Sequence, residues 1–358
     1  MFPQQTGFTK SSDGRKVLSK SLTVAFLLGV IVTALPRNSA AEKPADETLA
    51  RVFAAARARE SRVRSLTIAW RAETVRYADA NRGRRSEFEH PEDESFEKGD
   101  VTHNDQYTLR LDGDKLRDTF RRDDGSPSVN TFDGKLCRRL SYAFEKLRYP
   151  QGTLSHGADN TKMLTFKPVV WTFRLLSPTL STFKQERFRV VDESADLDGT
   201  RCVHLSDDVC DEDGRPVAAG STSLWLDPAR DYCVRKYAYG ERRPGRADTE
   251  VDITHIEHPI AGWIPSTWSI LSRLDGKVSY REISTVTSVE VNPAIAAGEF
   301  QLDFPSGTMV IDRTGKEERV FIVQPDGTER TVTQKEQRAK ISYDDLLKSE
   351  PDTLIPRE

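Results

Sequence analysis

The sequence lacks the glycine, serine and histidine motifs that mark the common enzyme classes. It contains no Gly-x-Gly-x-x-Gly, no Gly-x4-Gly-Lys-Ser/Thr, no Gly-x-Ser-x-Gly and no His-Glu-x-x-His. These patterns bind dinucleotides or phosphates, present a serine nucleophile or hold a catalytic zinc ion. The adjacent Ser155 and His156 do not replace them, because neighbours in sequence rarely face each other as nucleophile and base. The sequence therefore predicts a protein that is not an enzyme and needs no cofactor.

Metal ligands are also scarce. Among six histidines, His255 and His258 form the one close pair, and two residues three apart on a strand point to opposite faces. No cysteine or third histidine lies near them, so no metal site is predicted. The acidic pairs Asp207-Asp208 and Asp211 to Asp213 are typical of solvated turns, with a weak calcium site as the alternative.

The first 41 residues have the layout of a secretory signal. The apolar run Ser21 to Leu35 has 15 residues, fewer than the roughly 20 that a membrane-crossing helix needs. Small residues at Ser39-Ala40-Ala41 offer a cleavage site, and four basic residues precede the run: Lys10, Arg15, Lys16 and Lys20. We therefore expect a periplasmic or secreted protein, cleaved near Ala41. An uncleaved segment that acts as a weak membrane tether is the alternative.

The basic residues after this segment are scattered. Lys and Arg number 53 against 56 Asp and Glu, and removal of residues 1–41 takes away five basic residues and one acidic residue, which changes the formal net charge from −3 to −7. A nucleic-acid binder concentrates its basic residues on one face. No nucleic-acid partner is therefore predicted, and contact with a membrane is expected to be transient at most.

Four cysteines remain in the mature chain, and none forms a Cys-x-x-Cys pair. An even number in an exported protein permits two disulfides, with three possible connectivities. The sequence does not assign the pairs among Cys137, Cys202, Cys210 and Cys233.

The mature chain begins with a helix and a strand. Apolar residues recur at helical spacing between Asp46 and Ser61, which predicts an amphipathic helix. The stretch from Ser65 to Tyr77 then alternates apolar and polar residues, as a half-buried strand does. The following segment, Ala78 to Asp105, is highly charged and is predicted to be a solvated loop.

Turn signals then recur along the chain. Asp-Gly favours a tight hairpin because Gly adopts positive φ freely and Asp tolerates it. Asp227-Pro228 predicts a further hairpin turn rather than a catalytic loop. The alternation slips in phase between Tyr280 and Ile283, which predicts a bulge. Asp-Gly occurs seven times, at positions 112, 124, 133, 198, 213, 275 and 326. Together these signals predict a mainly β protein built on a curved antiparallel meander, an unclosed half-barrel.

One apolar segment interrupts the meander. A short helix is predicted from Pro168 to Leu176, because Pro is accepted in the first helical turn and Pro178 follows the end. This helix is apolar nearly all round and must be covered on both sides. It is either a plug that fills the concave face of the sheet or a lid over an apolar ligand site.

The C-terminal part alternates again from Gly298. It forms either strands that extend the sheet or a small separate unit, and Thr333 with Glu336 predicts a capping box before a last helix that ends near Lys348. We expect three parts: a signal peptide at 1–41, a half-barrel domain at 42–297, and an extension with a helix and a loose tail at 298–358.

An apolar ligand site is predicted on the concave face. Tryptophans on several expected strands could wall such a cavity, although packing in the core is their ordinary use. The candidate cavity and lid residues are Leu66, Ile68, Trp70, Val170, Trp171, Phe173, Leu175, Trp225 and Trp268.

Several phrases of the sequence resemble the periplasmic lipoprotein carrier (LolA-like) family of outer-membrane lipoprotein-sorting proteins. They include "ETLARVFAAARARE", "RLDGDKLR", "TFDGK", "LWLDPARDYCVRKYAY" and "FQLDFPSGTMVID", between Glu47 and Asp312. The resemblance implies an unclosed barrel with helices at its mouth and a cavity for acyl chains. It implies a lipid or lipoprotein acyl chain as the ligand and an envelope protein as a possible partner. A structural or adaptor protein with a filled core is the alternative.

Overall fold

The structure is a computed structural model that describes residues 44–77, 100–123, 127–142, 149–157, 164–181, 183, 185–207, 221–240, 247–339 and 341–348. The chain divides into two compact units, Met1–Ala41 and Glu42–Glu358, and all described residues belong to the second. The predicted leader, Cys210, Asp211 to Asp213 and the tail after Ser349 lie outside the described residues.

Sixteen strands form one sheet whose two edges, β16 and β7, do not meet. In sheet order the strands are β16 (Glu329–Val332), β15 (Arg319–Val323), β14 (Met309–Asp312), β6 (Gln151–His156), β5 (Leu136–Ser141), β4 (Pro127–Phe132), β3 (Lys115–Arg121), β2 (Val101–Asp112), β1 (Ser65–Arg76), β13 (Lys277–Val291), β12 (Gly262–Leu274), β11 (Ala247–His258), β10 (Cys233–Gly240), β9 (Ser221–Asp227), β8 (Thr200–Asp207) and β7 (Phe188–Leu197). All neighbours are antiparallel except β14 and β6, which are parallel. The predicted unclosed antiparallel sheet is confirmed, with this one exception.

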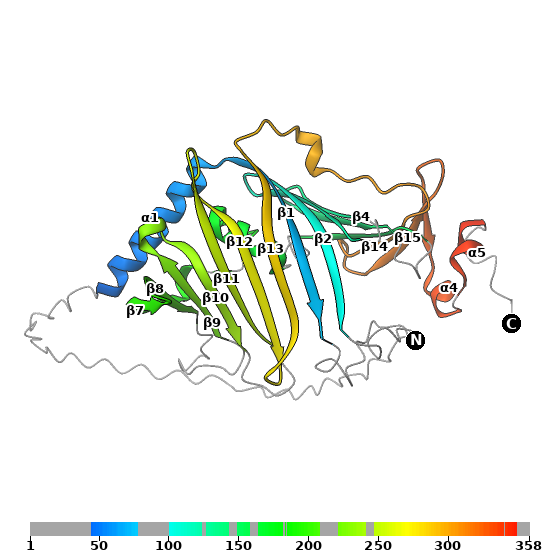
Figure 1. Ribbon diagram of the computed structural model, residues 1–358. Coiled ribbons are helices and arrows are strands. Elements are labelled where there is room, and N and C mark those ends of the chain that lie inside the picture. Colours follow the sequence, from blue (N-terminus) through cyan, green and yellow to red (C-terminus); the bar gives the residue numbers. More distant parts are fainter. Residues whose placement is uncertain are drawn as a thin grey trace, which may run out of the picture. The chain divides into compact units, whose positions relative to one another are not determined.

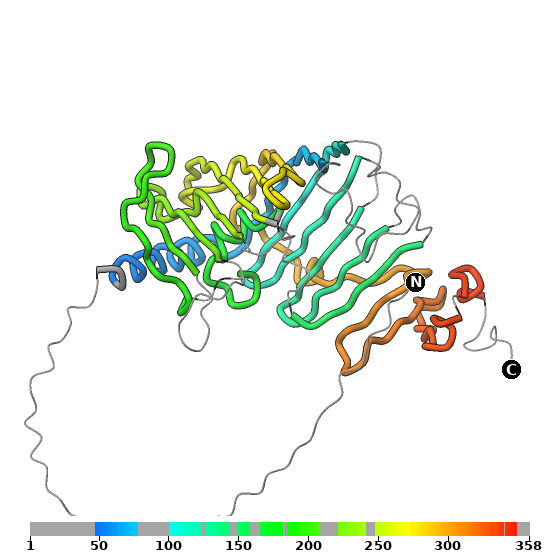
Figure 2. The backbone as a smooth tube through the Cα atoms, turned by 90° about the horizontal axis from the view of Figure 1, so that it is seen from below, coloured from blue at the N-terminus to red at the C-terminus, as the bar shows by residue number. Residues whose placement is uncertain are grey.

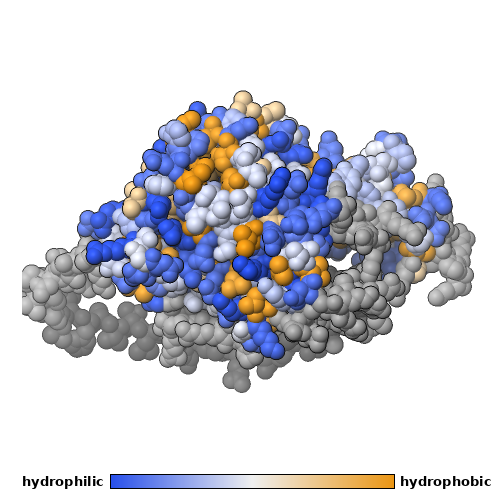
Figure 3. All heavy atoms as spheres, in the orientation of Figure 1, coloured by the Kyte–Doolittle hydropathy of each residue, from blue (hydrophilic) through white to orange (hydrophobic). Residues whose placement is uncertain are grey.

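The sheet bends, and the helices α1 (Pro44–Arg62) and α3 (Lys167–Phe173) lie on its inner side (Figures 1 and 2). The long strand β13 carries two bulges, where Ser279 and Thr287 have no partner in the register of the neighbouring strands. Bulges bend a strand and increase its twist. A bulge is predicted in this strand between Tyr280 and Ile283, and the two bulges that the structure has lie on either side of that interval, at Ser279 and Thr287. Figure 3 shows that the outer face is mostly hydrophilic, with apolar side chains in small patches.

The Asp-Gly dipeptides lie at the described hairpins, as predicted. Five of them join neighbouring strands, whereas those at positions 124 and 213 lie outside the described residues. In the β12–β13 turn, Asp275 and Gly276 have φ values of 50° and 78°, the conformation that a tight hairpin requires. Asp227 also begins a hairpin turn, a 3-10 helix η5 (Pro228–Arg230), and its carboxylate accepts a hydrogen bond from the Ala229 amide.

Two sequence predictions need correction. Residues 101–105 were expected in a loop but begin β2. Two of their inward side chains, His103 and Asp105, are polar, so the segment lacks the apolar alternation that predicts a strand. The last helix is in fact two, α4 (Gln334–Arg338) and α5 (Tyr343–Lys348), and the predicted capping box of Thr333 and Glu336 is present at α4. The remaining short elements are η3 (Leu164–Phe166), η4 (Gln185–Arg187) and η6 (Ala297–Phe300). Among the described residues, no helix is both long and apolar enough to span a bilayer.

The cysteines that the structure describes do not bear out a disulfide framework. Cys202 and Cys233 are buried free thiols, and Cys137 is also buried. Cys202 lies on β8 next to Val203, which is opposite Leu226 of β9. Cys233 lies on β10 and is opposite Asp227 of β9. Strand β9 therefore separates the two thiols. Two strand spacings are about 10 Å, beyond the Cα separation that a disulfide spans. Cys202 and Cys233 therefore do not pair with each other.

The buried guanidinium of Arg174 ties α3 to the rest of the fold. Its side chain is 3% exposed. It donates hydrogen bonds of 2.8 Å to the Gly113 carbonyl, 2.9 Å to the Val63 carbonyl and 2.8 Å to the Arg64 carbonyl. These carbonyls belong to the β2–β3 turn and to the chain between α1 and β1. One side chain therefore satisfies three backbone carbonyls in two separate segments.

Replacement of Arg174 by Met is expected to destabilise the protein strongly, because several buried carbonyls lose their donor. We expect the free energy of unfolding to fall by about 3 kcal/mol. Denaturation in urea, followed by circular dichroism, measures this. Arg71→Met is the matched control, because Arg71 is exposed on the outer face of β1. Equal stability of Arg174→Met and the wild type would contradict the role assigned to this side chain.

Candidate functional site

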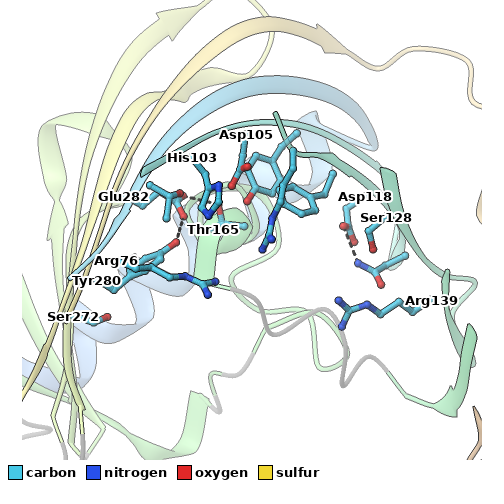
Figure 4. A pocket seen from close by; sticks show the side chains of 15 residues that line it. Arg76, His103, Asp105, Asp118, Ser128, Arg139, Thr165, Ser272, Tyr280 and Glu282 are labelled. Carbon is cyan, nitrogen blue, oxygen red and sulfur yellow. Dashed lines mark hydrogen bonds between the residues drawn. The ribbon is translucent and has the colours of Figure 1, made fainter. Parts of the chain in front are cut away.

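A polar cavity of about 390 Å³ lies on the concave face of the sheet. Its walls come from the inner faces of β1 to β5, β12 and β13, and from Thr165 of η3 (Figure 4). The lining residues are Thr74, Arg76, His103, Asp105, Tyr107, Asp118, Phe120, Arg122, Ser128, Asn130, Arg139, Thr165, Ser272, Tyr280 and Glu282. The volume is within the range of about 300–1,000 Å³ that is usual for small-molecule sites.

The cavity exists because the inward side chains change in character along each strand. In β2 the inward positions run from Asp105 and Tyr107 to Leu109 and Leu111, and all four are buried. Side chains two residues apart on a strand share a face. The apolar end of this series belongs to the hydrophobic core beneath α1 and α3, whereas the polar end lines the cavity.

A row of aromatic rings marks the border between these two regions. In sheet order, Trp268 comes from β12, Trp70 from β1, Tyr107 from β2 and Phe120 from β3, with β13 between β12 and β1. The ring centroids of Trp70 and Tyr107 are 5.1 Å apart and those of Tyr107 and Phe120 are 4.9 Å apart, both stacked. Trp268 meets Trp70 edge to face at 5.3 Å. Tyr107 and Phe120 line the cavity, while both tryptophans are fully buried behind them.

Glu282 is a fully buried carboxylate that hydroxyl groups satisfy. It accepts hydrogen bonds of 2.6 Å from Thr165, 2.5 Å from Tyr280 and 2.8 Å from Ser284. Hydrogen bonds to an ionised acceptor are short and strong. Glu282 therefore ties η3 to β13 at the edge of the cavity.

Asp105 and Asp118 are buried carboxyl groups that keep acceptor capacity. Asp118 Oδ1 accepts a 2.9 Å hydrogen bond from Asn130 Nδ2, whereas Asp118 Oδ2 and Asp105 Oδ1 accept none from the described residues. Burial raises the pKa of Asp118 to about 7 and that of Asp105 to about 6. Buried carboxyl groups with displaced pKa values in a cavity are typical of functional sites.

Arginine side chains reach the cavity from its more open side. Figure 4 shows the guanidinium groups of Arg76 and Arg139 pointing into the space from opposite walls. Arg76 is exposed and Arg139 is half-buried, whereas the three carboxyl groups are at most 6% exposed. The cavity therefore has an acidic floor (Asp105, Asp118 and Glu282) and an arginine rim (Arg76 and Arg139).

The predicted apolar site residues lie outside this cavity. Eight of them are buried in the hydrophobic core: Leu66, Ile68, Trp70, Val170, Trp171, Phe173, Leu175 and Trp268. Trp225 faces away from Leu224 and Leu226, the buried residues beside it on β9, and stacks on His204 with ring centroids 4.5 Å apart. The structure thus brings the eight together as core packing, and only Trp70 and Trp268 adjoin the cavity wall.

The short apolar helix is packed on every side. All seven residues of α3 are buried, and Trp171 stacks on Tyr237 at 4.5 Å and on Phe183 at 5.8 Å. The apolar crevice between α1, the segment after α3 and β7 to β9 has a volume of about 10 Å³. A crevice of that size holds about one water molecule at most. In the described structure α3 is therefore a plug.

The other candidate groups from the sequence are separated. His255 is buried beside Thr172, while the His258 ring nitrogen accepts hydrogen bonds from the amides of Ile260 and Ala261. Ser155 and His156 end β6, and Asp207 pairs with Arg187. The described residues include no group of three potential metal ligands.

Sequence reasoning missed the polar cavity because it searched for apolar pockets. The sequence predicts a loop at Asp105 and marks neither Asp118 nor Asn130 as a site residue. One signal was present: Asp118 and Asn130 occupy inward positions in strands whose inward residues also include Leu116 and Phe132, which are buried and apolar. A charged residue in the apolar phase of a strand is unusual enough to mark a site.

Comparisons with known proteins found structural likeness only. A DUF1329 family protein from Desulfovibrio piger is 7% identical, with a TM-score of 0.43, over 72% of this chain and 98% of that one. A LolA superfamily protein from Nitrosomonas europaea is 8% identical, with a TM-score of 0.39, over 72% and 97%. No family model and no curated protein matches the chain. The second neighbour bears the superfamily name that the sequence phrases suggested, but likeness at this level carries no argument about function.

Replacement of Asp118 by Asn is expected to stabilise the protein at high pH. An aspartate in the unfolded chain titrates near 4, below the folded pKa of about 7. The folded state therefore holds the proton more tightly, and stability falls as pH rises from about 4 to 7. Asn keeps an acceptor for Asn130 and carries no charge, so the free energy of unfolding should rise by about 2 kcal/mol at pH 8 and change little at pH 4.

Urea denaturation at both pH values measures this difference. Glu73→Gln, on the exposed face of β1, is the control and should change neither value by much. Arg117 and Arg139 are the charged groups that act on Asp118. A variant that is less stable than the wild type at pH 8 would show that these arginines outweigh the burial.

Proposed function

We propose that this chain is a non-catalytic binding protein of the cell envelope that holds one small ligand in the polar cavity of its half-barrel. The observation that carries the proposal is a pair of buried carboxyl groups, Asp105 and Asp118, that line the cavity and each have one oxygen without a hydrogen-bond donor among the described residues. Buried polar atoms nearly always have partners. A ligand that donates hydrogen bonds supplies them.

The proposal places the protein in the periplasm or outside the cell, exported by residues 1–41. Residues 42–297 form the binding domain, because every residue that lines the cavity lies between Thr74 and Glu282. Residues 298–358 extend the sheet through the parallel pair β14 and β6. We propose a polar ligand in place of the acyl chain expected from the sequence, because charged groups line the cavity and the apolar crevice beside α1 is small.

Two other functions compete. A structural or adaptor protein with a filled core is favoured by the complete burial of α3. A hydrolase is favoured by the raised pKa values of Asp105 and Asp118, because a carboxylic acid that keeps its proton near neutral pH can act as a general acid. Retention of an intact ligand separates binding from hydrolysis, and the absence of any ligand favours the adaptor.

Filling the cavity is expected to abolish ligand retention. Ser272 lines the cavity, whereas Ser269 lies on the other face of the same strand. We expect native mass spectrometry of the mature protein to show a small-molecule adduct for the wild type and for Ser269→Trp, and none for Ser272→Trp. A fluorescent fatty acid should bind none of the three proteins.

Each contrary result has a defined meaning. An adduct retained in full by Ser272→Trp would exclude this cavity as the site. Fluorescent fatty acid bound by the wild type would restore the acyl-chain ligand. No adduct in any protein would favour the adaptor, and release of a cleaved product would identify a hydrolase.

A further inference from the structure

Asp118, Asn130 and Arg139 form a cross-strand row on the cavity wall. Asp118 of β3 is opposite Asn130 of β4, and Asn130 is opposite Arg139 of β5. Directly opposed residues on neighbouring strands are the closest pairs on a sheet face. With two strand spacings between them, the Cα atoms of Asp118 and Arg139 are about 10 Å apart.

The acidic end of this row carries two acceptor oxygens that no described residue partners. Asn130 Nδ2 donates to Asp118 Oδ1, which orients the Asn130 amide. Asp118 Oδ2 and Asn130 Oδ1 accept no hydrogen bond from the described residues, and both side chains are 2% exposed. An ammonium group carries several N–H donors and no acceptor, so it matches this pair of oxygens. The negative charge of Asp118 adds an ion pair to the hydrogen bonds.

The other end of the row offers a cation. Arg139 forms no salt bridge with another described residue, and its guanidinium points into the cavity toward the side from which Arg76 enters (Figure 4). A guanidinium binds phosphate or carboxylate groups through two parallel hydrogen bonds. The cavity is therefore negative at its floor and positive at its rim, within the length of a small molecule.

We propose that the cavity takes a zwitterion, a primary ammonium group held by Asp118 and Asn130 with a phosphate or carboxylate a few bonds away held by Arg139 and Arg76. This inference rests on the proposed function and specifies its ligand class. A molecule with one charge satisfies only one end of the row. A lone anion leaves the buried Asp118 carboxylate without a partner, which is costly. A lone cation leaves the half-buried guanidinium of Arg139 without an anion. Free aminoalkyl phosphates and the headgroup of an ethanolamine phospholipid share the required chemistry.

The first test compares the binding of a zwitterion and of its two singly charged fragments to the wild-type protein. O-phosphoethanolamine carries both charges, ethanolamine only the ammonium group, and inorganic phosphate only the anion. We expect isothermal titration calorimetry at pH 8 to show that O-phosphoethanolamine binds about tenfold or more tightly than either fragment. Equal affinity for O-phosphoethanolamine and phosphate would overturn the ammonium site, and this arm needs no variant to fold.

The second test assigns each end. Asp118→Asn should weaken O-phosphoethanolamine about tenfold and leave phosphate unchanged, whereas Arg139→Gln should weaken both. Arg138→Gln is the matched control, because Arg138 lies on the other face of β5 and pairs with Asp133. Thermal unfolding confirms that each variant is folded. Loss of phosphate binding in Asp118→Asn to the same degree as O-phosphoethanolamine would overturn the assignment.

A third test distinguishes a lipid headgroup from a free ligand. It also separates a failure of the proposed ligand class from a failure of the proposed binding function. Vesicles of phosphatidylcholine with and without phosphatidylethanolamine are sedimented with the protein. Cosedimentation only with phosphatidylethanolamine identifies a lipid headgroup, and binding of O-phosphoethanolamine without cosedimentation identifies a free ligand. A protein that binds neither O-phosphoethanolamine nor the vesicles, while Ser272→Trp still removes a native adduct, is a separate outcome. That result would overturn the zwitterion as the ligand class and leave the proposed binding function in place. If no adduct exists either, both fail.

Discussion

The pairing of β1 with both β2 and β13 is the constraint on which the concave face depends. β1 is hydrogen-bonded to β2 over its full length and to β13 over nearly all of it, and it joins the two halves of the sheet. This double pairing determines which side chains of β1 point to the concave face, since a slip of one residue in the register would turn Trp70 to the outer face. Because Trp70 contacts rings from β2 and β12, the same register aligns the aromatic row. Core and cavity are thus positioned by one strand.

The concave face is divided between two kinds of chemistry. Beneath α1 and α3 it is a packed apolar core, closed by the buried hydrogen bonds of Arg174 and by those of Arg59, which donates to the Thr172 carbonyl at 3.0 Å. Beyond the aromatic row it is polar. The helices α1 and α3 cover only part of the bent sheet, so the uncovered end needs side chains that tolerate water or a ligand. Buried carboxyl groups at that end are costly unless partnered.

Asp118 illustrates how stability and function oppose each other in this cavity. Its burial favours the protonated form, so ionisation near neutral pH weakens the fold. The same charge, which forms no salt bridge with a described residue, is what would recognise a cationic group. Functional sites commonly retain such locally unfavourable residues, and substitutions there stabilise a protein at the cost of its activity. Glu282 contrasts with Asp118, because three hydroxyl groups satisfy it and leave it a structural role.

The sequence by itself determined the elements that local chemistry controls. Asp-Gly turns, the β13 irregularity, the helix α1, the capping box at α4 and the mainly antiparallel sheet all follow from short-range patterns. Periodicity also placed Leu66, Ile68 and Trp70 on a buried face. These features depend on residues close together in the chain. Their backbone conformation, and the face of the helix or strand that they occupy, can be predicted without knowledge of their tertiary contacts.

Only the tertiary structure decided what the buried face encloses. Asp105, Asp118, Asn130 and Arg139 come from four strands, and their meeting depends on the register of β2 to β5. Polar inward residues also weaken the alternation, which is why the start of β2 resembled a loop. The role of α3 as a plug depended on partners such as Tyr237, more than sixty positions away in the chain. Packing across distant strands, rather than any local pattern, determines where a space remains and which charges face it.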